Sequence, residues 1–270
     1  MKNQVVLVGL FLLFFSYTTF GQDLAYHQPV KQNARKTLDP PPPPESSLQS
    51  HIYNLYHQSQ LYKQHLSYDV FEKAVVGFYN LKAEGLFTEK ELLTIIDFTQ
   101  PSSEERLYII DLQNQKLLHR SLVAHGKNTG DIYATHFSNR VGSLQSSLGF
   151  YKASEAYIGK YGLSLKLDGL ETRINDNARK RAVVMHPADY VNYQFIRDNQ
   201  RLGRSFGCPA IPYEKHKQII KTIQGNTCLF IYQNATSYLR NTEKLNFDKA
   251  EQAFLREQVL LHANQMASVL

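Results

Sequence analysis

One of the two cysteines of this 270-residue chain, Cys208, lies in a setting that favours chemistry. It follows Gly207 in a polar turn, and Arg201 and Arg204 add positive charge close by in the sequence. A helix that we expect to begin near Pro212 would direct the positive end of its dipole toward the same turn. Each of these effects favours the thiolate, which is the nucleophilic form of cysteine. We therefore predict that Cys208 is a nucleophile and that backbone N–H groups of the Gly207–Cys208 turn receive a developing oxyanion.

A nucleophilic cysteine needs a base, and histidine is the usual one. His186 lies 22 residues before Cys208, at the end of an apolar run over 182–186 that is typical of a strand. Pro187 follows it and should end the ladder of hydrogen bonds. A side chain at the end of a strand can leave the core and reach a loop, so His186 is a candidate for the base. A single histidine at a strand end can also be an ordinary polar terminus, and the residues alone leave both interpretations open.

Other polar residues have simpler explanations. His216 shares a helical face with three isoleucines at spacings of three, four and seven, which favours a partly buried position in a helix. Two more histidines in a long loop can border a cleft, but their spacing matches no metal motif, and turn chemistry accounts for two aspartates. These residues are His125, His136, Asp168 and Asp176.

The N-terminal 21 residues have the pattern of a secretory leader. Lys2 precedes an apolar run over 5–15, and small residues precede Gln22. Eleven apolar residues are too few to cross a bilayer core of roughly 30 Å. We therefore expect export across the inner membrane to the periplasm or cell wall, with no transmembrane anchor after cleavage. In an oxidising compartment Cys208 can pair with Cys228, although Cys228 lies in an apolar run and has the pattern of a buried structural residue.

The charge of the chain is uneven. Thirty Lys and Arg against 24 Asp and Glu give a net charge of +6, and residues 173–221 alone hold ten basic and four acidic side chains. A concentrated basic surface predicts an anionic partner. Five consecutive prolines within residues 22–50 favour an extended, disordered spacer between the leader and the folded part.

The periodicity of the remaining chain predicts a mainly β fold with appended helices (α+β). Residues 51–98 repeat with a helical period and indicate a small subdomain of about three helices, with a capping box at 88–91 before apolar residues 92–96. Residues 99–237 form the predicted catalytic domain, an antiparallel β-sandwich or barrel-like core, and 238–270 a helical tail. The expected strands are 106–111, 116–124, 148–151, 163–167, 182–186 and 227–233, with helices from about 212 to a stop at 225 and over 247–268.

His186 followed by Ser205-Phe206-Gly207-Cys208 resembles the active-site signature of the L,D-transpeptidases, the YkuD-type cysteine enzymes that cross-link peptidoglycan. Within that group the chain is most similar to the murein L,D-transpeptidase catalytic domain family. The resemblance covers about residues 100–235. Matching stretches are Ala134, 137–139, 142–151, 162–171, 175–179, 188–190 and 203–210.

The resemblance implies a YkuD-like fold and a two-step acyl transfer on peptidoglycan stem peptides. The thiolate attacks the carbonyl of the third residue of a tetrapeptide stem, D-Ala leaves, and an amine of a second stem takes the acyl group. No cofactor and no metal are implied. The implied roles are nucleophile for Cys208, base for His186, oxyanion loop for Ser205 and Gly207, and substrate binding for Arg201, Arg204 and Asn139.

The sequence departs from the common signature in three ways. Phe206 stands where histidine is usual, and Pro187 follows the base where glycine is common. Pro209 and Ala210 replace the branched residue and the Asn or Arg that many relatives have after the cysteine. The match therefore assigns no residue to the clamping position that follows the nucleophile.

Several functions remain open from the sequence. The same thiol site working with water would be an L,D-carboxypeptidase, and the fold without turnover would be a peptidoglycan-binding module. A papain-like protease is disfavoured because its cysteine precedes its histidine, and nucleic-acid binding is disfavoured by the leader and the lack of a known motif. The sequence gives no indication of the oligomeric state.

Overall fold

The computed structural model describes residues 46–87 and 89–269, so the expected leader and most of the expected spacer lie outside the described residues. Helix α1 (Ser47–Gln58) begins within the segment that we assigned to the spacer. Ser46 caps it, because its side-chain oxygen accepts a hydrogen bond of 3.2 Å from the N–H of Gln49. The end of the spacer is thus corrected to residue 46 at the latest.

Two further elements complete the N-terminal helical part. A short 3-10 helix η1 (Leu61–Gln64) leads to α2 (Tyr68–Ala83). The hydroxyl of Ser67 caps α2 by accepting from the N–H of Val70 at 3.3 Å. Ten residues of α2 are buried, which explains the strong helical periodicity of this stretch.

Eight strands form one sheet in the order β3-β2-β1-β8-β4-β5-β6-β7. The pairs β1–β8 and β6–β7 are parallel and the other pairs are antiparallel. The predicted mainly β fold with helices at both ends is therefore confirmed. The strands are β1 (Leu92–Asp97), β2 (Leu107–Asp111), β3 (Lys116–Ser121), β4 (Gly149–Gly159), β5 (Gly162–Gly169), β6 (Val184–Ala188), β7 (Ala210–Pro212) and β8 (Thr227–Tyr232).

The expectation of a helix over residues 92–96 is wrong, because this stretch is strand β1 in the middle of the sheet. A short run that is apolar throughout has no periodicity by which a buried strand can be distinguished from a buried helix. Its β-branched residues and its burial on both faces suit a central strand. The segment 51–98 is therefore no separate helical subdomain, since β1 pairs with β2 and β8. Thr88 of the expected capping box lies outside the described residues.

The C-terminal helices differ from expectation in their bounds. Helix α4 (His216–Ile223) begins four residues after Pro212, which belongs to β7 instead. Two short helices, α3 (Tyr193–Asn199) and α5 (Thr236–Asn241), were not predicted. The final helix α6 (Phe247–Val269) is confirmed.

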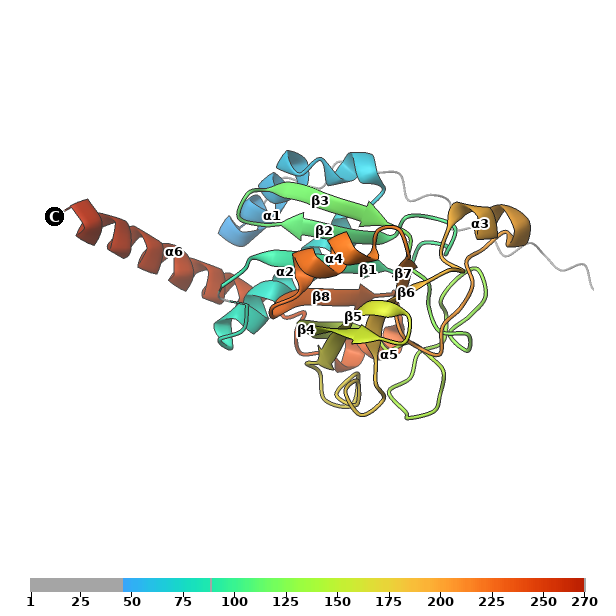
Figure 1. Ribbon diagram of the computed structural model, residues 1–270. Coiled ribbons are helices and arrows are strands. Elements are labelled where there is room, and N and C mark those ends of the chain that lie inside the picture. The colour runs from blue at the N-terminus through green and yellow to red at the C-terminus, as the bar shows by residue number, and fades with distance from the viewer. Residues whose placement is uncertain (1–45, 88, 270) are drawn as a thin grey trace, which may run out of the picture. The chain divides into compact units, whose positions relative to one another are not determined.

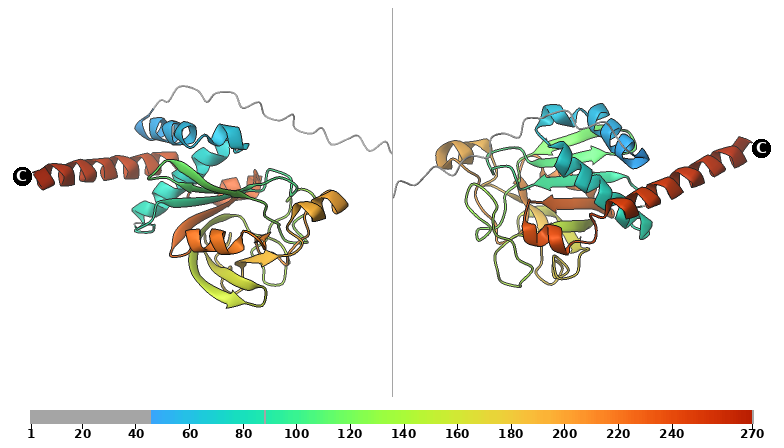
Figure 2. Two further views of the ribbon diagram at one scale, coloured as in Figure 1. Left: turned by 45° about the horizontal axis from the view of Figure 1, so that its top comes forward. Right: turned by 180° about the vertical axis from the view of Figure 1, so that it is seen from behind.

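Helices cover both faces of the sheet (Figures 1 and 2). Helix α4 lies on one face, against β4, β5 and β6. Helix α2 lies on the other face, against β1 and β8, and the first part of α6 packs on α2. Long loops gather beside β6 and β7, at the same end as α3. The predicted catalytic residues His186 and Cys208 lie at this end of the sheet, on β6 and just before β7.

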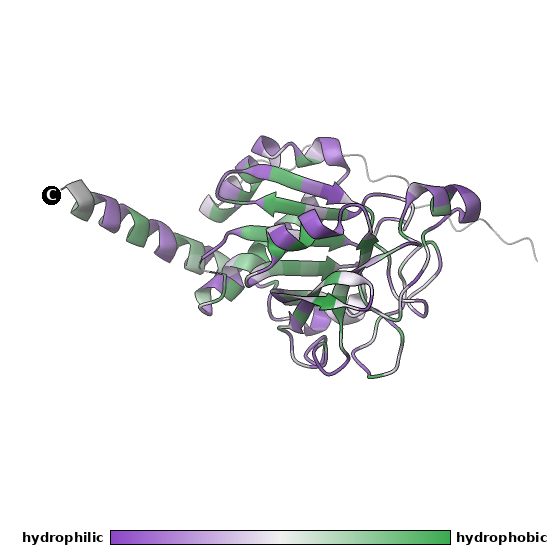
Figure 3. Cartoon of the chain, viewed as in Figure 1, coloured by the Kyte–Doolittle hydropathy of each residue, from purple (hydrophilic) through white to green (hydrophobic). Residues whose placement is uncertain are grey.

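Apolar residues are concentrated in the inner strands of the sheet (Figure 3). All six residues of β8 are buried, as are five of the six in β1. Within the described residues no helix has the length and apolarity needed to cross a membrane.

A close approach between α2 and β4 fixes how the helix lies on the sheet. Gly77 faces Phe150, and a methyl group added at Gly77 would lie 1.9 Å from the nearest ring carbon. The ring of Phe150 is stacked on Phe230 of β8, with centroids 4.1 Å apart. Phe150 therefore has little room to yield.

Replacing Gly77 with alanine should destabilise the fold by about 1–3 kcal/mol, because overpacking outweighs the gain in helix propensity. The free energy of unfolding in urea measures the effect. In a Phe150→Leu background the same replacement should cost much less, since the obstructing ring is gone. Equal costs in both backgrounds would contradict the packing explanation.

Candidate active site

The parallel pairing of β6 with β7 brings the two predicted catalytic residues to neighbouring positions of the fold. His186 pairs with Ala210, which lies two residues after Cys208. The backbone N–H of His186 donates to the carbonyl of Pro209 at 3.3 Å. Residues that are 22 positions apart in the sequence therefore stand on adjacent segments.

Pro187 does not end β6, contrary to the sequence expectation. The strand continues to Ala188, and Pro187 pairs with Ile211 of β7. Proline is tolerated in a strand where its missing N–H is not needed. β6 pairs with β5 only through Val184 and Met185, so Pro187 breaks no hydrogen bond to that strand.

The thiol of Cys208 is partly exposed and lies against the chain that leads into β6. Its Sγ accepts from the N–H of Val184 at 3.5 Å and lies 3.7 Å from the carbonyl oxygen of Ala182. Burial raises the pKa of this thiol, while the Val184 N–H and the charge of Arg181 act in the opposite direction. The resting residue is therefore a thiol that needs a base to become a nucleophile.

A hydrogen bond orients the ring of His186 and leaves one ring nitrogen free. Its Nδ1 lies 2.9 Å from the carbonyl oxygen of Pro187, and a carbonyl can only accept, so Nδ1 carries the proton. Burial lowers the pKa of His186 below its usual value of 6.5, although the hydrogen bond to Pro187 opposes this effect. The neutral ring therefore presents Nε2 as an acceptor at neutral pH, with the ring of Tyr161 5.7 Å away.

Ser205 and Gly207 fix the shape of the turn that carries the cysteine. The hydroxyl of Ser205 donates to the carbonyl of Cys208 at 2.6 Å and accepts from the N–H of Gly207 at 3.1 Å. Gly207 has a φ of +125°, and a Cβ there would lie 2.8 Å from the carbonyl oxygen of Gln145. Glycine is thus needed both for its backbone angle and for space.

Only one of the two turn amides that we expected at the oxyanion is free. The N–H of Gly207 is already bonded to Ser205. The N–H of Cys208 has no acceptor within the part of the chain that the structure describes. Of the two backbone amides, the N–H of Cys208 is therefore the remaining candidate donor to an oxyanion.

Arg201 and Arg204 both bind a carboxylate of the protein. Their guanidinium groups lie 2.7 Å and 3.1 Å from the same oxygen of Asp131. Two cations on one anion leave a net positive charge near the turn. Their predicted role in binding substrate stays a prediction.

Asn139 lies in the loop between β3 and β4 and joins it to residues 176 and 177. Its amide donates to Asp176, and its side-chain oxygen accepts from the N–H of Asn177 at 3.2 Å. The structure therefore shows a bridging contact between two loops, and substrate binding by Asn139 also stays a prediction.

Arg181 is the residue near the cysteine that the sequence analysis missed. It lies in the turns before β6, and its guanidinium binds oxygens of the loop at 138–147. The sequence offers three consecutive cations, Arg179, Lys180 and Arg181, without a sign of which one points inward. Arg179 points to the surface instead, where it pairs with Asp168 and Glu155.

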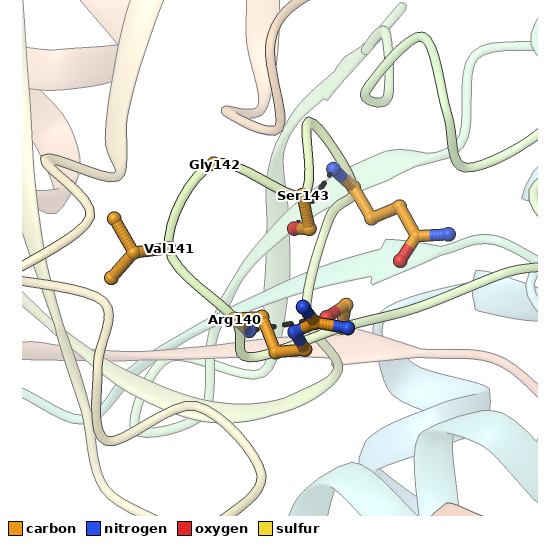
Figure 4. Close-up of a pocket in the computed structure, with 6 residues that line it drawn as sticks. Arg140, Val141, Gly142 and Ser143 are labelled. Atoms are coloured by element: carbon orange, nitrogen blue, oxygen red, sulfur yellow. Dashed lines mark hydrogen bonds between the residues drawn. The ribbon is translucent and has the colours of Figure 1, made fainter.

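A hollow of about 280 Å³ lies on the loop that Arg181 binds (Figure 4). The loop curls around Gly142, and the side chain of Ser143 accepts from the N–H of Gln145. The residues that line the hollow include neither Cys208 nor His186. They are Ser138, Arg140, Val141, Gly142, Ser143 and Gln145.

The described residues contain no group of three or more His, Cys, Asp or Glu side chains that could hold a metal ion. His216 is buried in α4, and its Nδ1 lies 2.5 Å from the carbonyl oxygen of Tyr213, as suits a structural histidine. His125 is buried and His136 is exposed.

Residues 62–232 match the sequence profile of the L,D-transpeptidase catalytic domain family, which is well over half of the chain. The chain belongs to this family. The matched region begins before α2, so the N-terminal helix α2 and strand β1 are part of the family domain. No curated protein matches the sequence.

Solved structures of L,D-transpeptidases are similar at low sequence identity. The enzyme from Mycobacterium smegmatis is 9% identical with a TM-score of 0.35, over 53% of this chain and 59% of that one. Enzymes from Mycobacterium tuberculosis H37Rv and Xylanimonas cellulosilytica are 8% and 10% identical, with TM-scores of 0.34 and 0.30. The match to the Mycobacterium tuberculosis enzyme covers 53% of this chain and 58% of that one. The match to the Xylanimonas cellulosilytica enzyme covers 54% of this chain and 62% of that one. The chain thus spans less than two thirds of each, and the family assignment rests on the sequence match.

Iodoacetamide should modify Cys208 in the native protein and leave Cys228 untouched. Both thiols are free, but Cys228 is fully buried and its pKa is raised well above the usual value by burial. Mass spectrometry of tryptic peptides should find the label on Cys228 only after unfolding in urea. A native disulfide between the two cysteines would contradict a reactive Cys208.

Proposed function

We propose that this chain is an exported L,D-transpeptidase in which Cys208 is the nucleophile and His186 is its base. The observation that carries the proposal is the parallel pairing of β6 with β7, which sets a neutral, oriented histidine beside the turn of a partly exposed cysteine. Membership of the L,D-transpeptidase family supports the same chemistry. Export rests on the leader-like pattern of residues 1–21.

The first half-reaction forms a thioester on the enzyme. The thiol of Cys208 gives its proton to Nε2 of His186, and Sγ attacks the carbonyl carbon of the third residue of a tetrapeptide stem. The N–H of Cys208 receives the oxyanion. The bond to the terminal D-Ala then breaks, and its amine leaves with the proton from His186.

The second half-reaction transfers the acyl group. An amine of a second stem attacks the thioester carbonyl and passes a proton to His186. That proton returns to Sγ as the thioester bond breaks, so the thiol is regenerated and a new amide links the two stems. The net positive charge of Arg201, Arg204 and Asp131 provides attraction for the carboxylates of the stem peptides.

The purified protein, incubated with disaccharide-tetrapeptide, should release D-Ala and form a cross-linked dimer that mass spectrometry detects. Cys208→Ala should reduce both products to background, because it removes the sulfur atom that forms the proposed acyl-enzyme. Cys228→Ala is the matched control: it should retain activity while losing about 1 kcal/mol of stability.

Release of D-Ala without the dimer would overturn the transferase assignment in favour of an L,D-carboxypeptidase that uses water. No product from folded protein would overturn the enzymatic proposal and favour a peptidoglycan-binding module. Full activity of Cys208→Ala would exclude this cysteine as the nucleophile.

The pH dependence of kcat/KM should show a single limb on the acid side, with its midpoint below 6.5. His186 acts as base only when it is neutral, and burial lowers its pKa, so activity falls as the pH drops through that value and stays level above it. The thiol does not limit this plateau, since its own pKa is raised.

His186→Gln should lower kcat/KM by about 10²–10⁴-fold and abolish the acid limb. An acid limb with a midpoint above 7 in the unmodified protein would contradict a neutral resting histidine.

A further inference from the structure

Arg181 is held in the wall of the site by neutral oxygens alone. Its Nη1 donates to the carbonyl of Ser138 at 2.7 Å and to the hydroxyl of Ser147 at 3.0 Å. Its Nη2 donates to the carbonyl of Gln145 and lies 3.5 Å from the hydroxyl of Ser143. Among the described residues no carboxylate pairs with it. Burial lowers the pKa of Arg181, as expected of a cation that has lost water without gaining an anion.

Arg181 contrasts with the other arginines around the site. Arg179 binds Asp168 and Glu155, and Arg201 and Arg204 share Asp131. Those three cations already have partners of opposite charge. A half-buried cation without an anion is costly unless a negative charge appears beside it during function.

The guanidinium lies directly beside the turn that carries Cys208. A Cβ added to Gly207 would lie 3.4 Å from Nη2 of Arg181. Arg181 and Cys208 also influence each other electrostatically: the cation lowers the pKa of the thiol, and a charge on the thiol raises that of the guanidinium. Both effects have the sign that attraction between a cation and a thiolate requires.

Arg181 is the cation among the described side chains that interact electrostatically with Cys208. His186 is neutral at neutral pH because burial lowers its pKa. Tyr190 interacts with Cys208 and Tyr161, but burial raises the pKa of Tyr190 to about 12, so it is neutral as well. The N–H of Val184 supplies a dipole and no net charge.

We propose that Arg181 is the fixed counter-charge for the negative charge that Cys208 acquires when its thiol gives up the proton. The proposal rests on Cys208 as the nucleophile of the proposed function. Pro209 and Ala210, which follow the cysteine in the sequence, carry no charge. Arg181 reaches the same turn from the segment before β6 and supplies a cation there.

The rate of alkylation of Cys208 by iodoacetamide, measured against pH without substrate, tests the charge directly. In Arg181→Gln the midpoint of the profile should move up by about one pH unit, and the rate at pH 7.5 should fall roughly tenfold. The rate at the alkaline plateau should change little. Arg181→Lys should keep most of the original midpoint, because it keeps the charge and loses the fork of hydrogen bonds.

Arg179→Gln is the matched control, since Arg179 lies two residues away and points to surface carboxylates. In Arg179→Gln the midpoint of the pH profile of Cys208 alkylation should not change. If Arg181→Gln fails to fold, Ser143→Asp gives a second route: it places a carboxylate beside Nη2 and should raise the midpoint while Arg181 stays in place. Circular dichroism and the melting temperature verify folding.

An unchanged midpoint in folded Arg181→Gln would overturn the proposal, and a raised KM in the same variant would show that Arg181 binds a substrate anion instead. Equal shifts in the Lys and Gln variants would also overturn it, because hydrogen bonding rather than charge would then explain them. Alkylation needs no peptidoglycan, so this outcome is independent of whether transpeptidation is observed.

Discussion

Strands β6 and β7 are five and three residues long, and their parallel register pairs His186 with Ala210. Parallel strands cannot be joined by a tight turn, so a long connection between them is obligatory. Here that connection is residues 189–209, which contain α3 and end in the turn of Cys208. The proposed nucleophile thus lies at one end of this crossover connection, and the proposed base lies at the other end.

A buried network behind the turn supports it. Arg106 is fully buried and donates to the carbonyl of Val123 and to Nδ1 of His125, the latter at 2.9 Å. The carbonyl of His125 in turn accepts from the N–H of Ser205. Burial lowers the pKa of His125 to about 3, so this histidine stays a neutral acceptor over the range in which His186 titrates. The support of the turn is therefore insensitive to the pH that controls the base.

Burial shifts the pKa values of the two proposed catalytic residues in opposite directions. It favours the neutral forms of both, raising the pKa of Cys208 and lowering that of His186. The site at rest therefore holds little charge on Sγ of Cys208 and on the ring of His186. In the proposed reaction, the guanidinium of Arg181 and the N–H of Val184 are already in position to receive the negative charge of the thiolate.

The sequence by itself determined the mainly β fold, the helices at both ends and the family, because periodicity and motif spacing are local properties. It also singled out Cys208 and His186, whose residue types and flanking turns are visible without a fold. The strand at 92–97 and the unpaired state of Arg181 were decided by tertiary structure. A short apolar run becomes a central strand only when neighbours cover both faces. Likewise, the sequence does not show which of the three adjacent cations lies near Cys208. In the folded chain Arg179 pairs with two carboxylates, whereas Arg181 pairs with none among the described residues.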